Sequence, residues 1–389
     1  MTENFYQALN QWSTRPDDQR FWTIGEMLVQ TRHYRESARE ATTELSSLKL
    51  QVNAKDNLEI VGLSGIPASV THHTFGQLSR TVGAPADYLR KLPAQLAAVN
   101  VNVGLHNSEA SANLLIHSND SLILSAVATD SYTRIWDYDI VERLTALESY
   151  GWRVPPARPV HADQTSARKA TAADVLLCSS HPGMGIKEGD MIAPSGLYAS
   201  DHDMFAFLVN EDRRINDGTA DGMSRGSFIS NSEVANGRAL KITMFLYRHV
   251  CGNHIVWNAS DVNEIKICHR GDANERFDAG LTAELRKYAD ASAAEDESRI
   301  TQSQRYSLGG TKADVLDTLF KGLRGDISRK SLESGYDFAE NASHSDRTID
   351  PRTAWGMTQG LTAYSQTMPY AETRNAIDLA AGKVLSMAF

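Results

Sequence analysis

The chain has 389 residues, of which 41% are hydrophobic and 22% charged, with a formal net charge of −9 at pH 7. It is long enough for one large domain or two ordinary ones with a substantial core, and its charge repels nucleic acid and anionic membranes at long range, so any polyanion site must be local. Three cysteines are too few for a disulfide framework, the N-terminus lacks a basic region followed by an apolar stretch, and no apolar run of about 18 residues occurs, so we expect a cytoplasmic protein that is neither exported nor membrane-spanning.

The first predicted element is a helix over residues 22–44. Ile24, Met27 and Leu28 lie close to helical spacing and precede a charged tail. The segments SLKLQVN and NLEIVGL then surround a short polar loop at 55–57. This pattern predicts a β-hairpin.

The next predicted helix begins at Thr71, whose hydroxyl suits an N-cap, and ends at Gly83. Helical spacing resumes over residues 86–96, and Pro93 predicts a break there because proline disrupts a helix interior.

Residues 112–129 predict two strands joined by a Ser-Asn-Asp turn, and residues 132–151 predict a short loop and a helix ended by glycine. Residues 1–150 thus form a predicted N-terminal α+β region. Residues 151–172 are rich in proline and predict a connection.

Residues 173–275 read as a β-rich central region, because short β-branched and aromatic runs are separated by Gly, Asn and Asp. The predicted strands are DVLLCSS, DMIAPSGLYAS, MFAFLVNE, GSFISNSE, ALKITMFLYRHV, HIVWNAS and EIKICHR.

Residues 276–389 predict a helical C-terminal region, with helices near 278–300, 311–324, 329–342, 351–365 and 372–388. The expected fold class is therefore α+β: a central antiparallel sheet or partial barrel, with N-terminal helices and a helical C-terminal region packed as one compact unit.

Two cysteine–histidine pairs give the pattern most like a metal site. Cys251 and His254 are three residues apart, as in many zinc sites, and Cys268 is followed directly by His269. Neighbours on a strand point to opposite faces, so Cys268 and His269 are not expected to bind one ion, and the cysteines are better interpreted as small core residues. We predict no cofactor.

Asp201, His202 and Asp203 offer a second candidate metal or acid–base group. Carboxylates beside a histidine raise its basicity and supply oxygen ligands. Because the three residues lie between two strand-like runs, a solvated turn is the favoured interpretation.

Basic and aromatic residues recur along the predicted sheet. Single-stranded nucleic acid needs that combination, since phosphates bind Lys and Arg while bases stack on aromatic rings. The alternative is that the rings belong to the core and the cations to a solvated rim. The candidate nucleic-acid-binding residues are Tyr132, Arg134, Trp136, Lys241, Tyr247, Arg248, Trp257, Lys266, His269 and Arg270.

Three segments in this order resemble the phage/plasmid-like protein family, domain of unknown function 932: GLYASDHDMFAFLVNE, SFISNSEVANGRALKITMFLYRHVCGNHIVW and KICHRG. The resemblance covers most of residues 20–290 and implies a cytoplasmic protein of a mobile element. Within it, Cys268 stands where the pattern has a basic residue, which puts a strict phosphate role at this position in doubt. The positions that match are Ser232, Glu233, Cys251, Asn253, Lys266 and His269.

Mobile elements commonly encode annealing or recombination proteins, so the leading hypothesis is an oligomeric single-stranded-DNA-binding protein associated with recombination, annealing or replication. The first alternative is a metal-dependent enzyme acting on nucleic acid or nucleotides. The second is a non-catalytic phage factor that binds a host protein through its acidic surface.

Overall fold

The computed structural model describes most of the chain beyond the N-terminal segment. The described residues are 17–62, 66–118, 121–155, 158–159, 167–178, 186–194, 196–219, 222–235, 239–248, 253–255, 264–323, 325–344, 346–365, 367–368 and 371–388.

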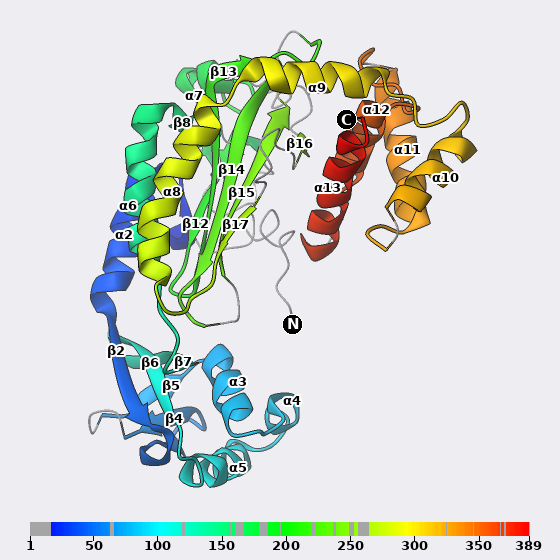
Figure 1. Cartoon of the computed structure of the whole chain (residues 1–389). Coiled ribbons are helices and arrows are strands. Elements are labelled where there is room, and N and C mark those ends of the chain that lie inside the picture. Colours follow the sequence, from blue (N-terminus) through cyan, green and yellow to red (C-terminus); the bar gives the residue numbers. More distant parts are fainter. Residues whose placement is uncertain are drawn as a thin grey trace.

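A twisted antiparallel sheet forms the centre of the molecule (Figure 1). Its strands run in the order β1-β12-β13-β14-β15-β16, with β8 paired to β13 and β17 paired to β15, so the described strands make an open sheet. They are β1 (Arg20–Phe21), β8 (Trp152–Arg153), β12 (Leu197–Ala199), β13 (Asp203–Ile215), β14 (Met223–Ser232), β15 (Leu240–Arg248), β16 (Asn253–Ile255) and β17 (Glu264–Ile267).

Alternation along β13 divides the sheet into two buried faces. Met204, Ala206 and Leu208 contribute to a core with helices on one face, whereas Phe205 and Phe207 contribute to an aromatic cluster on the other. The helices over the first face lie together beside the sheet (Figure 1). They are α2 (Ile24–Ser37), α6 (Asp137–Leu147) and α8 (Ala273–Asp290).

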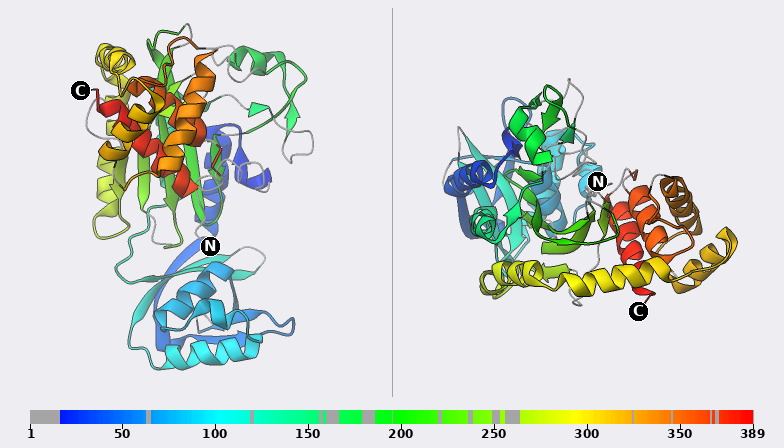
Figure 2. Two further views of the ribbon diagram at one scale, coloured as in Figure 1. Left: turned by 90° about the vertical axis from the view of Figure 1, so that its right-hand side faces the viewer. Right: turned by 90° about the horizontal axis from the view of Figure 1, so that it is seen from above.

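Residues 38–129 form a separate unit, which we call the small lobe; the central sheet and the helices over it are the main body (Figures 1 and 2). The small lobe has its own sheet, in the order β2-β6-β7-β5-β4-β3, and its own hydrophobic core. Its elements are β2 (Ala38–Glu44), β3 (Lys49–Val52), β4 (Leu58–Val61), β5 (Ala68–Val70), α3 (His72–Thr81), α4 (Ala86–Leu89), α5 (Ala94–His106), β6 (Ser111–Ser118) and β7 (Leu122–Thr129).

The C-terminal helices form a bundle beside the sheet, and α9 connects it to α8 (Figure 2). Trp355 and Leu385 of the bundle share a core with Ile215, Met223 and Leu246 of the sheet, so the bundle docks on the main body. The helices are α9 (Ala293–Arg305), α10 (Lys312–Gly322), α11 (Arg329–Ser343), α12 (Ala354–Ser365) and α13 (Ala371–Ser386).

A small three-stranded sheet and one short helix complete the described fold. They are β9 (Arg158–Pro159), β10 (Arg168–Lys169), β11 (Met191–Ala193) and α7 (Ala172–Cys178). Short 3-10 helices occupy Asp17–Gln19, Leu45–Ser47 and Glu148–Tyr150.

The α+β fold class is confirmed, and several local predictions with it. The β3–β4 hairpin forms, Thr71 accepts a hydrogen bond from the Thr74 backbone as an N-cap, and Pro93 separates α4 from α5. Gly151, at φ 82°, ends the helical segment after α6 in the left-handed conformation that glycine tolerates.

Four element predictions were wrong. The helix predicted over 22–44 ends at Ser37, because residues 38–44 pair along their whole length with β6. Residues 172–178 form a helix instead of a strand, and the helix predicted over 278–300 is interrupted between α8 and α9. The segment DMIAPSGLYAS, predicted as one strand, contains two strands, β11 and β12, which belong to different sheets. Tertiary pairing overrides local propensity in the first case.

The cores divide the chain differently from the predicted regions. Residues 1–150 do not make one unit, because α2 and α6 pack on the central sheet while residues 38–129 fold around a separate core. The predicted connection begins inside the main core as well: Trp152 is fully buried against it.

Candidate nucleic-acid interface

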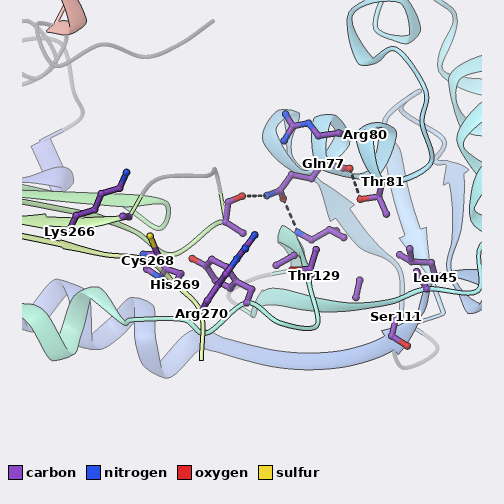
Figure 3. Close-up of a pocket in the computed structure, with 17 residues that line it drawn as sticks. Leu45, Gln77, Arg80, Thr81, Ser111, Thr129, Lys266, Cys268, His269 and Arg270 are labelled. Atoms are coloured by element: carbon purple, nitrogen blue, oxygen red, sulfur yellow. Dashed lines mark hydrogen bonds between the residues drawn. The ribbon is translucent and has the colours of Figure 1, made fainter. Parts of the chain in front are cut away.

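A pocket of about 450 Å³ lies between the small lobe and the main body. From the small lobe, α3 and the adjoining strands β6 and β7 line it; from the main body, β17 and the residues after it do so (Figure 3). The lining residues are Leu45, Gln77, Arg80, Thr81, Ala110, Ser111, Ala112, Val127, Ala128, Thr129, Tyr132, Ala235, Ala239, Lys266, Cys268, His269 and Arg270.

Three cations stand around this pocket. Arg80 comes from α3, whereas Lys266 and Arg270 come from the opposite wall (Figure 3). All three residues are exposed, and none forms an ion pair with a described residue. No Asp or Glu occurs among the described lining residues, so this region is locally positive in a molecule whose net charge is −9.

The floor of the pocket is apolar. Leu45, Ala112 and Val127 are buried small-lobe residues, and Ala239 is buried on the side of the main body. The polar residues Thr81, Ser111 and Thr129 also line the pocket. The pocket therefore combines an apolar surface with cations and polar residues, as many small-molecule sites do.

Tyr132 and His269 form one wall of the pocket. Their rings are stacked, with centroids 5.1 Å apart and planes at 10°, and the Tyr132 hydroxyl donates to the Ser232 carbonyl at 3.1 Å. Burial lowers the pKa of His269 to about 4, and its Nδ1 lies 3.2 Å from the Thr133 carbonyl. His269 is therefore a neutral group that orients Tyr132 and supplies no positive charge.

Arg134 and Trp136 are not among the residues that line the pocket. Arg134 is buried, donates from Nε to the Glu233 carbonyl at 2.8 Å and pairs with Glu40, while burial lowers its pKa to about 10. Trp136 is 7% exposed and packs in a core with Val234. The predictions of a phosphate contact and a stacking platform were wrong here, because both side chains are used to join the lobes.

Lys241, the remaining predicted residue whose side chain is described, does not line the pocket. Lys241 lies on β15, half-exposed, with its Nζ 3.8 Å from a Glu264 carboxylate oxygen. The side chains of Tyr247 and Arg248 and the whole of Trp257 lie outside the described residues. Of the predicted cations whose side chains are described, Lys266 and Arg270 line the pocket.

The Asp201–His202–Asp203 group is a turn whose carboxylates are already engaged. Asp203 is buried and accepts hydrogen bonds from the Tyr198 hydroxyl at 3.2 Å and the Ser200 hydroxyl at 2.9 Å. His202 Nδ1 pairs with the Asp201 carboxylate. Within the described residues, no three potential ligands gather around a common point.

The cysteine–histidine pattern also gives no described metal site. The side chains of Cys251 and His254 lie outside the described residues. Cys268 is exposed in the pocket wall, whereas His269 is buried, so the two neighbours point in different directions as their adjacency predicts. The interpretation of Cys268 as a core residue was wrong.

Arg80 and Gln77 were missed from the sequence. Both lie on one helix of the small lobe, where the surrounding sequence has no basic cluster to mark them. Only the packing of α3 against the residues that follow β14 brings them opposite Lys266 and Arg270.

A scan against protein-family models, a search of curated proteins and a search of solved structures each found no match. The resemblance to the phage/plasmid-like family therefore stays a prediction. Among the described helices, none has the length and apolar character needed to cross a bilayer.

Proposed function

We propose that this chain binds single-stranded nucleic acid in the pocket between the small lobe and the main body. The observation that carries the proposal is the set of three exposed cations, Arg80, Lys266 and Arg270, placed around a pocket whose described lining has no carboxylate. Phosphates are bound by such cations, and the charge is local, as a net charge of −9 requires.

The apolar floor favours a single strand over a duplex. An unpaired base is free to turn toward Leu45, Val127 and the Tyr132 ring while its phosphates stay at the cationic rim. The bases of a duplex are stacked inside it, so a duplex would leave the floor unused.

The first test is a fluorescence-anisotropy titration with single-stranded and duplex oligonucleotides at about 50 mM and about 200 mM salt. We expect the single strand to bind more tightly, with a log–log salt slope of roughly −0.7 for each phosphate neutralised. Alanine at Arg80, Lys266 or Arg270 should weaken binding and make the slope less steep by about 0.7 each.

Lys330→Ala is the matched control, because Lys330 is an exposed cation on α11, far along the chain from the pocket residues. It should leave both affinity and slope unchanged. Equal loss for the control and the pocket variants, or binding that does not respond to salt, would contradict the proposal.

A further inference from the structure

The small lobe is seated on the residues of the main body that directly follow β14. The Val234 carbonyl accepts from Gln77 Nε2 at 2.7 Å and lies 3.0 Å from His73 Nε2, and the Ala235 carbonyl accepts from Gln77 at 3.2 Å. The Val234 side chain packs with Leu115 of the small lobe. Movement of these two residues would therefore loosen the lobe.

Directly behind this seat lie two buried carboxyl groups. Asp137 and Glu233 are 2% and 3% exposed, and the Asp137 backbone N–H donates to Glu233 Oε1 at 2.5 Å. Asn231 Nδ2 donates to Asp137 Oδ1 at 2.7 Å, whereas Asp137 Oδ2 has no hydrogen-bond partner among the described residues.

No cation pairs directly with either carboxylate in the described part of the chain. Arg134, whose charge acts on Glu233, uses its guanidinium on the Glu233 carbonyl and on Glu40. Two like charges so placed repel in a medium where water does not screen them. The other charged groups that act on the pair are Arg35 from α2, Asp139 from α6 and Asp203 from β13.

We propose that a proton held by the Asp137–Glu233 pair controls how firmly the small lobe is seated, and thereby regulates the pocket. With one carboxyl protonated, the two groups do not repel, and Val234 and Ala235 keep their hydrogen bonds to Gln77. With both ionised, repulsion displaces Glu233, and the adjoining Val234 and Ala235 lose their bonds to Gln77. The regulation of binding rests on the proposed function; the movement of the lobe does not.

The electrostatics place this change near neutral pH. Burial raises the pKa of Glu233 to about 7. Burial, followed by the neighbouring Glu233, also raises the pKa of Asp137. As the pH rises, the Asp137–Glu233 pair loses its proton. The small lobe is therefore firmly seated at lower pH and loosened at higher pH. Gln77, Tyr132 and Ala235 all line the pocket, so loosening changes its shape.

The test measures the distance between the lobe and the rest of the molecule without nucleic acid. Spin labels are placed at Lys55→Cys, in the small-lobe hairpin, and Lys330→Cys, in the C-terminal bundle, with the native cysteines changed to serine. We expect a narrow distance distribution at about pH 6 and a broader one at about pH 8. Glu233→Gln, which cannot ionise, should stay narrow at both.

Glu36→Gln, at an exposed carboxylate of α2, is the control and should behave as the parent protein does. Asp137→Asn provides a second way to remove the charge if Glu233→Gln does not fold. The inference would be overturned if the parent protein gave the same distance distribution at both pH values. It would also be overturned if Glu233→Gln and Asp137→Asn broadened at about pH 8 as much as the parent protein does. Neither outcome depends on nucleic-acid binding.

The link to the pocket has its own measurement. We expect the affinity for a single-stranded oligonucleotide to fall between about pH 6 and about pH 8 in the parent protein. This fall should be roughly fivefold larger than the fall measured for Glu233→Gln. Equal falls, together with a pH-dependent distance, would show that the lobe moves without regulating binding. No binding at either pH would contradict the proposed function alone.

Discussion

At the scale of single residues, the described interior contains a buried ion pair in which each charge is stabilised by the other. Arg225 and Asp296 join β14 to α9, with Arg225 Nη2 2.5 Å from Asp296 Oδ2 and both side chains nearly inaccessible. Burial raises the pKa of Asp296 to about 6, although Arg225 opposes this shift. Desolvation is thus the larger effect, and each charge is tolerated because the other is present.

Removing one partner of this pair should be more harmful than removing both. Asp296→Ala leaves the Arg225 guanidinium buried without a counter-charge, for an expected loss of about 3 to 5 kcal/mol in the free energy of unfolding. The double variant Arg225→Met with Asp296→Leu should lose less, because no buried charge remains. Urea denaturation of the two variants compares them, and a double variant at least as unstable as the single one would contradict this explanation.

At the scale of elements, α11 and α12 pack closely because glycines lie at their contact. A Cβ on Gly360 would stand 2.0 Å from the Gly335 carbonyl oxygen and 2.7 Å from the Ala339 Cβ. Glycine is otherwise unfavourable inside a helix by about 1 kcal/mol relative to alanine. At Gly360, the close approach of the α11 and α12 backbones explains why a glycine stands inside the helix.

Alanine at Gly360 should therefore destabilise the bundle, whereas alanine at Gly280 should not. A Cβ on Gly280, in α8, has nothing within 4 Å. We expect Gly360→Ala to lose about 2 kcal/mol or more through overpacking and Gly280→Ala to gain up to about 1 kcal/mol from helix propensity. Thermal unfolding of both variants gives the comparison; similar shifts in Tm would show that packing at Gly360 is not the cause.

At the scale of the whole molecule, titration of the buried Glu233 links stability to pH. Because its pKa in the folded state is about 7, above the ordinary value of 4.5, the folded state holds this proton more firmly than the unfolded state does. The contribution of Glu233 to stability is therefore full below pH about 4.5, decreases as pH rises toward about 7, and is constant above that.

Glu233→Gln should remove this dependence. Relative to the parent protein, the variant should gain stability as pH rises from about 5 to about 8, by up to about 3 kcal/mol. Urea denaturation across this range measures the difference, and the exposed variant Glu36→Gln supplies the control. A difference that is constant with pH would mean that Glu233 titrates alike in both states.

The sequence by itself determined what depends on neighbours along the chain. The strand at β13, the cap at Thr71, the break at Pro93 and the helical spacing of the C-terminal region each follow from local sterics and periodicity, and the fold class followed from their order.

Only the tertiary structure decided which side chains meet. Arg80 lies opposite Lys266 because a small lobe, inserted between α2 and α6, is seated on the residues that follow β14. The same contact buries Arg134 and Trp136, which the sequence offered equally well as surface groups. Burial and charge pairing depend on residues distant in sequence, and no local pattern records them.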